Sequence, residues 1–115
     1  KQKGSVKMYY PVSAHLIEFL ILSVLQKEDS YGYEISRTVK LVADIKESTL
    51  YPILKKLEKN GFMTTYTKEY QGRKRKYYSL TDAGVEELKF LNSEWISYRD
   101  TIDGIVEGRI KNDER

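Results

Sequence analysis

The sequence contains no cysteine, and it has one histidine among 115 residues. Without cysteine the chain can form no disulfide, bind no metal through thiolates and use no thiol nucleophile. It also has no glycine-rich phosphate loop and no spacing typical of metal ligands, and we expect its single histidine, His15, to lie at the start of a helix. Paired acids such as Glu86 and Glu87 are neighbours on a helix and point apart. We therefore predict that the chain is not an enzyme and needs no metal and no cofactor.

Long hydrophobic runs are absent as well. The most apolar stretch, Leu16 to Leu25, is interrupted by Glu18 and is shorter than the roughly 20 residues that a membrane-spanning helix requires. No small-residue cleavage site follows Leu25, which argues against a secretory signal. We expect a buried helix here, no membrane partner and a cytoplasmic location, which the lack of cysteine also favours.

The charges of the chain are unevenly distributed. A chain of 115 residues corresponds to one domain. Residues 46–79 hold nine Lys and Arg against three acids, a net charge of +6, whereas the remainder carries a net charge of −3. A basic block inside an otherwise acidic chain indicates an electrostatic footprint on one face.

Hydrophobic periodicity predicts two helices in the first third of the chain. The apolar positions after Ser13 follow helical spacing to about Lys27. A second helix is expected from about Tyr31 to Val42, with Ser30 as its N-cap.

A third helix is expected from about Glu47 to Asn60, after a short connection. Ser48 or a neighbour would cap it, and Gly61 would end it in the left-handed conformation. Pro52 is tolerated in a helix if it falls within about the first turn, where its missing N–H costs little.

A hairpin and a long helix complete the predicted order. The segment 62–81 has two β-branched and aromatic runs around a turn at Gly72. Thr81 and Asp82 then begin a helix that reaches about Arg109. The fold class is thus mainly α with a small β-hairpin (α+β), in the order α-α-α-β-β-α, which is typical of a winged helix-turn-helix.

The third helix is the candidate reading helix, because the second helix of a helix-turn-helix lies in the DNA major groove. Opposite its leucines it presents short hydroxyls, one aromatic and several ammonium groups that suit base edges and phosphates. An amphipathic surface helix is the alternative explanation. The predicted contacts, with Lys59 further along the same face, are Ser48, Thr49, Tyr51, Pro52, Lys55 and Lys56.

The hairpin carries a run of cations that would flank this helix as a wing and contact phosphates. A solvated turn is the alternative for the run taken alone. Alternation places Tyr78 inward and Tyr77 outward beside Arg75. The predicted wing contacts are Arg73, Lys74, Arg75, Lys76 and Tyr77.

Three ordered motifs carry a family resemblance. "SYGYEI" (30–35), "ESTLYPILKKLEKNGF" (47–62) and "GRKRKYYSLTDAG" (72–84) resemble the PadR family of bacterial transcriptional regulators over roughly residues 15–105. The resemblance implies a homodimeric winged-helix protein that binds double-stranded DNA, most often as a repressor, in some members released by a small molecule. By this resemblance "STLYP" to Lys55 reads bases and "GRKRK" is the wing. Many members carry a larger C-terminal helical domain, whereas this chain resembles the short form with a single terminal helix.

The last helix has apolar residues at alternating spacings of three and four, which is typical of an a/d seam and implies a partner helix. The seam predicts a homodimer interface formed by Leu88, Leu91, Trp95, Tyr98, Ile102 and Ile105. Trp95 could also form an aromatic wall for a small aromatic or hydrophobic effector, although interface packing is the explanation that we favour.

We therefore divide the chain into a winged helix-turn-helix at 9–81 and a dimerisation helix at 82–110. The function expected is that of a dimeric DNA-binding regulator, a repressor of an inverted-repeat operator that an effector could release. The alternatives are a winged-helix module for protein contacts and an RNA-binding domain that uses the exposed aromatics.

Overall fold

The protein is described here by a computed structural model that covers residues 10–111; residue 9, where the first expected domain begins, lies outside this range. The predicted order of helices and hairpin strands is confirmed, with one short strand added before the second helix. The elements are α1 (Ala14–Lys27), β1 (Ser30–Tyr31), α2 (Gly32–Val39), α3 (Glu47–Lys59), β2 (Met63–Tyr70), β3 (Arg73–Leu80) and α4 (Asp82–Val106).

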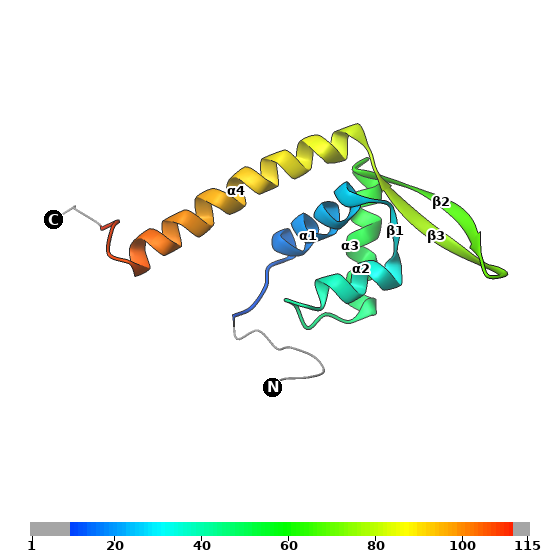
Figure 1. Ribbon diagram of the computed structural model, residues 1–115, viewed down its shortest axis with the longest axis horizontal. Coiled ribbons are helices and arrows are strands. Elements are labelled where there is room, and N and C mark those ends of the chain that lie inside the picture. The colour runs from blue at the N-terminus through cyan, green and yellow to red at the C-terminus, as the bar shows by residue number, and fades with distance from the viewer. Residues whose placement is uncertain (1–9, 112–115) are drawn as a thin grey trace.

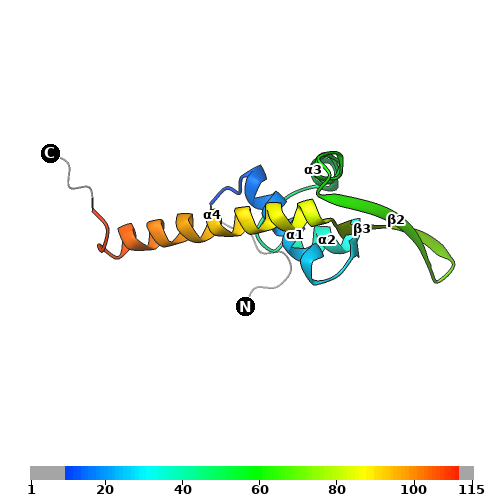
Figure 2. The same cartoon turned by 90° about the horizontal axis from the view of Figure 1, so that it is seen from above.

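The molecule is elongated, with extents of 65 × 39 × 22 Å. Helices α1, α2 and α3 form a central body (Figure 1). The hairpin β2–β3 projects from one end of this body, and α4 lies along α1 and continues past the body at the other end, as both views show (Figure 2). In residues 10–111 none of the helices is long and apolar enough to cross a bilayer.

The core lies where the three body helices meet the base of the sheet. Each helix contributes the row of apolar side chains that its helical spacing predicts. Burial of one such side chain stabilises a fold by about 1.5–3 kcal/mol. The side chains that are almost completely inaccessible are Ile21, Leu22, Ile35, Val39, Leu50, Leu54, Leu57 and Met63.

The start of α2 differs from the prediction. Ser30 is not its N-cap, because the backbone of Ser30 pairs with that of Tyr78 in the sheet. The Ser30 hydroxyl instead donates a hydrogen bond of 2.6 Å to Oε1 of Glu34. Tyr31 is the residue at the cap position, and α2 ends at Val39, three residues before the expected end.

Helix α3 begins at Glu47, as expected, but its capping differs from the prediction. Lys46 occupies the cap position without a side-chain hydrogen bond, so neither Ser48 nor a neighbouring side chain caps the helix. Pro52 is the sixth residue of α3 and therefore lies beyond the first turn, contrary to the prediction. Since proline has no N–H, it cannot donate to the carbonyl of Ser48. Gly61 does end the helix with a left-handed φ of 84°, as expected.

The hairpin has the predicted turn. Gln71 and Gly72 have φ values of 52° and 78°, which is the pattern of a two-residue type I′ turn. The register pairs Tyr70 with Arg73 next to the turn. Strand β1 joins the outer edge of β3, so the sheet has the order β1-β3-β2. From here on the hairpin β2–β3 is called the wing.

Helix α4 leaves the wing through a tight junction. Thr81 caps it as predicted, because its hydroxyl oxygen accepts a hydrogen bond of 3.0 Å from the Gly84 amide. A Cβ on Gly84 would collide with the carbonyl oxygen of Phe62, which itself accepts the Thr81 amide at 3.1 Å. This close approach explains the glycine in "TDAG" and fixes the direction of α4 relative to the wing.

The far end of α4 is closed by a short reversal. The helix ends at Val106, three residues before the expected end at Arg109. Gly108 has a left-handed φ of 77°, and Ile110 folds back so that its side chain lies against Gly104. Any larger side chain at residue 104 would displace Ile110.

Candidate nucleic-acid interface

One side of α3 faces the wing across an open hollow. Tyr51, Lys55 and Lys59 follow one another at intervals of four residues, so they lie in one row along the helix. Lys76 of β3 reaches the same hollow from the wing. The structure therefore brings two predicted site residues of α3 together with one from the cation run, and Lys59 with them. The complete lining is Tyr51, Lys55, Glu58, Lys59, Lys76 and Tyr78.

Tyr51 is held by the backbone of α2. A Cβ placed on Gly32 would lie 2.6 Å from the Tyr51 hydroxyl oxygen and 2.8 Å from its Cε1. The ring thus packs directly on the first residue of α2, while 43% of Tyr51 remains exposed. Gly32 in "SYGYEI" is explained by this contact, which the sequence alone did not predict.

Lys56 points to the other side of α3. Its ammonium forms an ion pair of 2.9 Å with Oε2 of Glu18 on α1, and Glu18 is only 8% exposed. A carboxylate so deeply buried requires a cation beside it. Lys56 is therefore occupied with the packing of α1 on α3 and lies apart from the hollow that contains Lys55.

The remaining predicted residues of α3 lie at its N-terminal end. Ser48, Thr49 and Pro52 are all exposed there. Thr49 lies beside a second hollow, which is bounded by the connection between α2 and α3 and by residues 10–12.

The cation run of the wing is divided between the two faces of the sheet. Because side chains alternate along a strand, Lys74 and Lys76 lie on the face of the buried Tyr78, whereas Arg73 and Arg75 lie on the opposite face. Arg73, Lys74 and Lys76 are exposed, and Arg75 is half-buried. The inward position of Tyr78, which is 5% exposed, confirms the prediction.

The opposite face of the three-stranded sheet carries four tyrosines, here called the tyrosine face: Tyr31 of β1 and, on the wing, Tyr66, Tyr70 and Tyr77. Tyr77 stacks on Tyr66, with ring centroids 5.6 Å apart, and meets Tyr31 edge-on at 5.5 Å. It does lie outward beside Arg75, as predicted. Its ring is also packed between these two neighbours, which gives it a packing role, and the phosphate contact stays a prediction.

The tyrosine face is connected to the body by one further bond. The Tyr66 hydroxyl donates a hydrogen bond of 2.6 Å to Oδ2 of Asp29. This bond raises the pKa of Tyr66 above its usual value, because the carboxylate favours the protonated phenol. The phenol therefore keeps the proton that it donates throughout the neutral pH range.

The a/d seam of α4 divides into two parts. Leu88 is 4% exposed and belongs to the core of its own chain, and Leu91 packs against that core. Beyond the half-buried Trp95, the seam is open to solvent: Tyr98 is 63% exposed, Ile102 42% and Ile105 58%. The second part is thus an apolar surface without a covering element in residues 10–111.

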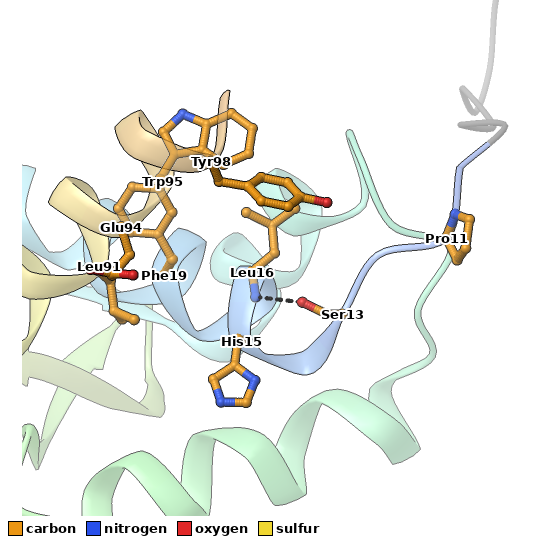
Figure 3. A pocket seen from close by; sticks show the side chains of 9 residues that line it. All are labelled: Pro11, Ser13, His15, Leu16, Phe19, Leu91, Glu94, Trp95 and Tyr98. Carbon is orange, nitrogen blue, oxygen red and sulfur yellow. Dashed lines mark hydrogen bonds between the residues drawn. The ribbon is translucent and has the colours of Figure 1, made fainter. Parts of the chain in front are cut away.

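An open groove separates the middle of α4 from the start of α1 (Figure 3). Trp95 and Tyr98 lie over Leu16 in this view, and His15 points away from the indole. The groove has a volume of about 390 Å³. Its lining is mostly apolar and consists of Pro11, Ser13, His15, Leu16, Phe19, Leu91, Glu94, Trp95 and Tyr98.

The body of three helices, the wing that follows it, and the lysine-lined hollow between the wing and α3 define a winged helix-turn-helix protein. Comparison with known proteins gives the family. The profile of the transcriptional regulator PadR-like family matches residues 21–90, and the chain belongs to this family. Its members are transcriptional regulators, which confirms the prediction that the chain is not an enzyme.

Three relatives illustrate the similarity. The crystal structure of smu.1704 from Streptococcus mutans has 68% sequence identity and a TM-score of 0.89, covering 92% of this chain and all of that one. A PadR family transcription regulator from Clostridium difficile has 34% identity and a TM-score of 0.72, covering 78% and 97%. The negative transcriptional regulator PadR of Bacillus subtilis is 39% identical over 79 residues, which are 64% of this chain and 43% of that protein.

Proposed function

We propose that the protein is a dimeric repressor that binds an inverted-repeat operator in duplex DNA. The observation that carries this proposal is the shared surface of Tyr51, Lys55 and Lys59 on α3 with Lys76 on the wing. The three ammonium groups share this open surface with one carboxylate, that of Glu58, so the surface keeps an excess of positive charge that a phosphate would offset. The name of the Bacillus subtilis relative, a negative regulator, supports repression over activation.

The contacts divide by chemistry along α3. The N-terminal end of the helix offers short polar and aromatic side chains, Ser48, Thr49 and Tyr51 with Pro52 beside them, which suit base edges in the major groove. Lys55 and Lys59 lie one and two turns further on and suit phosphates. Lys76, together with Arg73 and Lys74 at the wing tip, extends the phosphate contacts along the neighbouring backbone.

Dimerisation is assigned to α4. Its exposed seam of Tyr98, Ile102 and Ile105 is an apolar surface that a second copy would cover. Residues 9–81 then act as the DNA-binding unit and 82–110 as the dimerisation helix. In a twofold dimer the two reading helices face half-sites separated by about 34 Å, one turn of DNA, or a multiple of it.

An effector site is assigned to the groove between α1 and α4. Trp95 and Tyr98 offer aromatic faces, and Leu16 and Phe19 an apolar floor. This lining suits a small, planar, apolar molecule. Because the groove adjoins the seam, such a molecule would act on the dimer and thereby on the spacing of its reading helices.

The proposal is tested by binding to genomic DNA fragments. Fluorescence anisotropy at several salt concentrations should show one fragment bound at least about 10³-fold more tightly than random duplex. The matched probes are the same sequence as single-stranded DNA and as duplex RNA. Equal or tighter binding of RNA would contradict the proposal, and absence of binding to any nucleic acid would favour a module for protein contacts.

Gly32→Ala provides a prediction specific to the reading helix. The added Cβ must displace the Tyr51 ring, so we expect operator affinity to fall by about tenfold, the scale of one base contact. Stability should change little, since the ring is the free end of a flexible side chain and alanine favours a helix by up to about 1 kcal/mol over glycine. Anisotropy and thermal melting measure the two effects. Unchanged affinity in the Gly32→Ala variant would remove Tyr51 from the interface.

A further inference from the structure

We propose that Arg75 is a positioning residue of the wing and not a contact to DNA. It lies between Tyr31 and Tyr70, and by joining them it holds the outer half of the wing at a fixed angle to the body. The position of Lys76 relative to α3 then depends on Arg75. This inference rests on the proposed DNA-binding function for its consequence, and on the tyrosine face for its geometry.

The guanidinium of Arg75 lies over two aromatic rings. Its Cζ lies 4.2 Å from the centroid of Tyr31 and 4.3 Å from that of Tyr70. Both distances are well within the range of a cation–π interaction. Tyr31 belongs to β1 and leads directly into α2, whereas Tyr70 is the last residue of β2 before the turn. Arg75 thus joins the body to the tip of the wing.

The outer wing needs such a link because it has little other support. Strand β1 pairs only with Tyr77 and Tyr78, so among the described residues the segment 67–76 is a two-stranded ribbon. A two-stranded hairpin is marginally stable by itself in water. Residues 67–74 are all exposed, and none contributes to the core.

The inner part of the tyrosine face gives the link a firm base. Tyr77 is packed between Tyr31 and Tyr66, and Tyr66 is hydrogen-bonded to Asp29 in the body. Arg75 continues this layer by one further step toward the turn. A rigid layer on one face of the ribbon also fixes the direction of the side chains on the other face, where Lys76 lines the same hollow as Lys55 and Lys59.

The role proposed for residue 75 depends on the planar shape of the arginine side chain more than on its charge. A guanidinium is planar and can stack on two rings at once, whereas an ammonium is a point charge on a flexible stem. A phosphate contact, in contrast, would be retained in large part by lysine. Arg75→Lys therefore separates the two roles.

The experiment compares Arg75→Lys, Arg75→Gln and Tyr70→Leu with the control Lys76→Gln in the full chain. Hydrogen exchange of the amides in residues 67–76 is measured first, without DNA. We expect exchange to rise about fivefold to tenfold in the first three variants, because opening of the ribbon becomes easier, and to stay near the wild-type rate in Lys76→Gln.

Operator affinity and its salt dependence are then measured for the same proteins. Arg75→Lys and Tyr70→Leu should each lose operator affinity about threefold to tenfold, although neither removes a charge. The double variant Tyr70→Leu/Arg75→Gln should lose no more affinity than the weaker of its two single variants, because both act on the same contact. Lys76→Gln should instead reduce the slope against log salt by about 0.9 per subunit.

Wild-type exchange and affinity in Arg75→Lys, with a reduced salt slope in Arg75→Gln, would overturn the inference and make Arg75 a phosphate contact. The hydrogen-exchange measurement is made without DNA and does not depend on DNA binding. If the wild-type protein bound no duplex, the proposed function would fail, whereas the exchange rates would still decide whether Arg75 orders the wing.

Discussion

Replacing Lys55, Lys59 and Lys76 together by glutamine is expected to lower operator affinity by at least about 10³-fold at moderate salt. The three ammonium groups share one open surface between α3 and the wing. Each phosphate contact contributes about 0.9 to the slope of log affinity against log salt, so the slope of a dimer should decrease by about 5. Anisotropy titrations over a series of salt concentrations measure both quantities.

A control with the same change in net charge separates this surface from the charge of the whole chain. Lys89, Arg109 and Lys111 are exposed cations on α4 or just beyond it. Their joint replacement by glutamine should leave the slope within about one unit of the wild type. Equal losses in both triple variants would show that the binding is governed by overall charge and would remove the surface from the proposal.

The second large effect is expected from Ile102→Asp. Ile102 is 42% exposed on a single chain and lies in the open part of the seam between Tyr98 and Ile105. In the proposed dimer a carboxylate at this position would be buried without a partner, so the variant should be monomeric at concentrations at which the wild type associates. Operator affinity should fall with it, because each subunit alone holds half of the contacts. Sedimentation equilibrium measures the association.

The choice of Ile102 follows from the two parts of the seam. Aspartate at Leu91 would also disturb the core of its own chain, against which Leu91 packs, so loss of the dimer could not be distinguished from loss of the fold. Ser93→Asp places the same charge on an exposed position of α4 outside the seam and should remain dimeric. A dimeric Ile102→Asp protein would show that α4 pairs through another face.

Much of this fold could be predicted from the sequence because local signals agree with the final packing. Leu50, Leu54 and Leu57 have helical spacing and are buried together. Thr81 precedes a helix and caps it, and the pair Gln71–Gly72 gives the turn that its composition favours. In each case the residues that determine the element are within a few positions of one another.

The sequence does not reveal contacts in which the partner lies far along the chain or on a neighbouring strand. Ser30 has the composition of a cap, yet pairing with Tyr78 draws its backbone into the sheet. Lys56 looks like its neighbour Lys55, but Glu18, 38 residues earlier, pairs with it. The cations Arg73 to Lys76 are alike in sequence, and it is the two tyrosines beside Arg75 that distinguish it from the rest.

The length of α4 has a mechanical consequence. With 25 residues at about 1.5 Å each, α4 is about 37 Å long. Within residues 10–111 its first half is attached to the rest of the protein, where it packs on α1 (Figure 1). If two such helices are joined along their free halves, a pivot of about 5° at the attachment moves the opposite end by about 3 Å. A displacement of that size approaches the rise of one base pair. In the proposed dimer, a ligand bound beside Trp95 would thus displace both DNA-binding units from their half-sites without altering the structure of either unit.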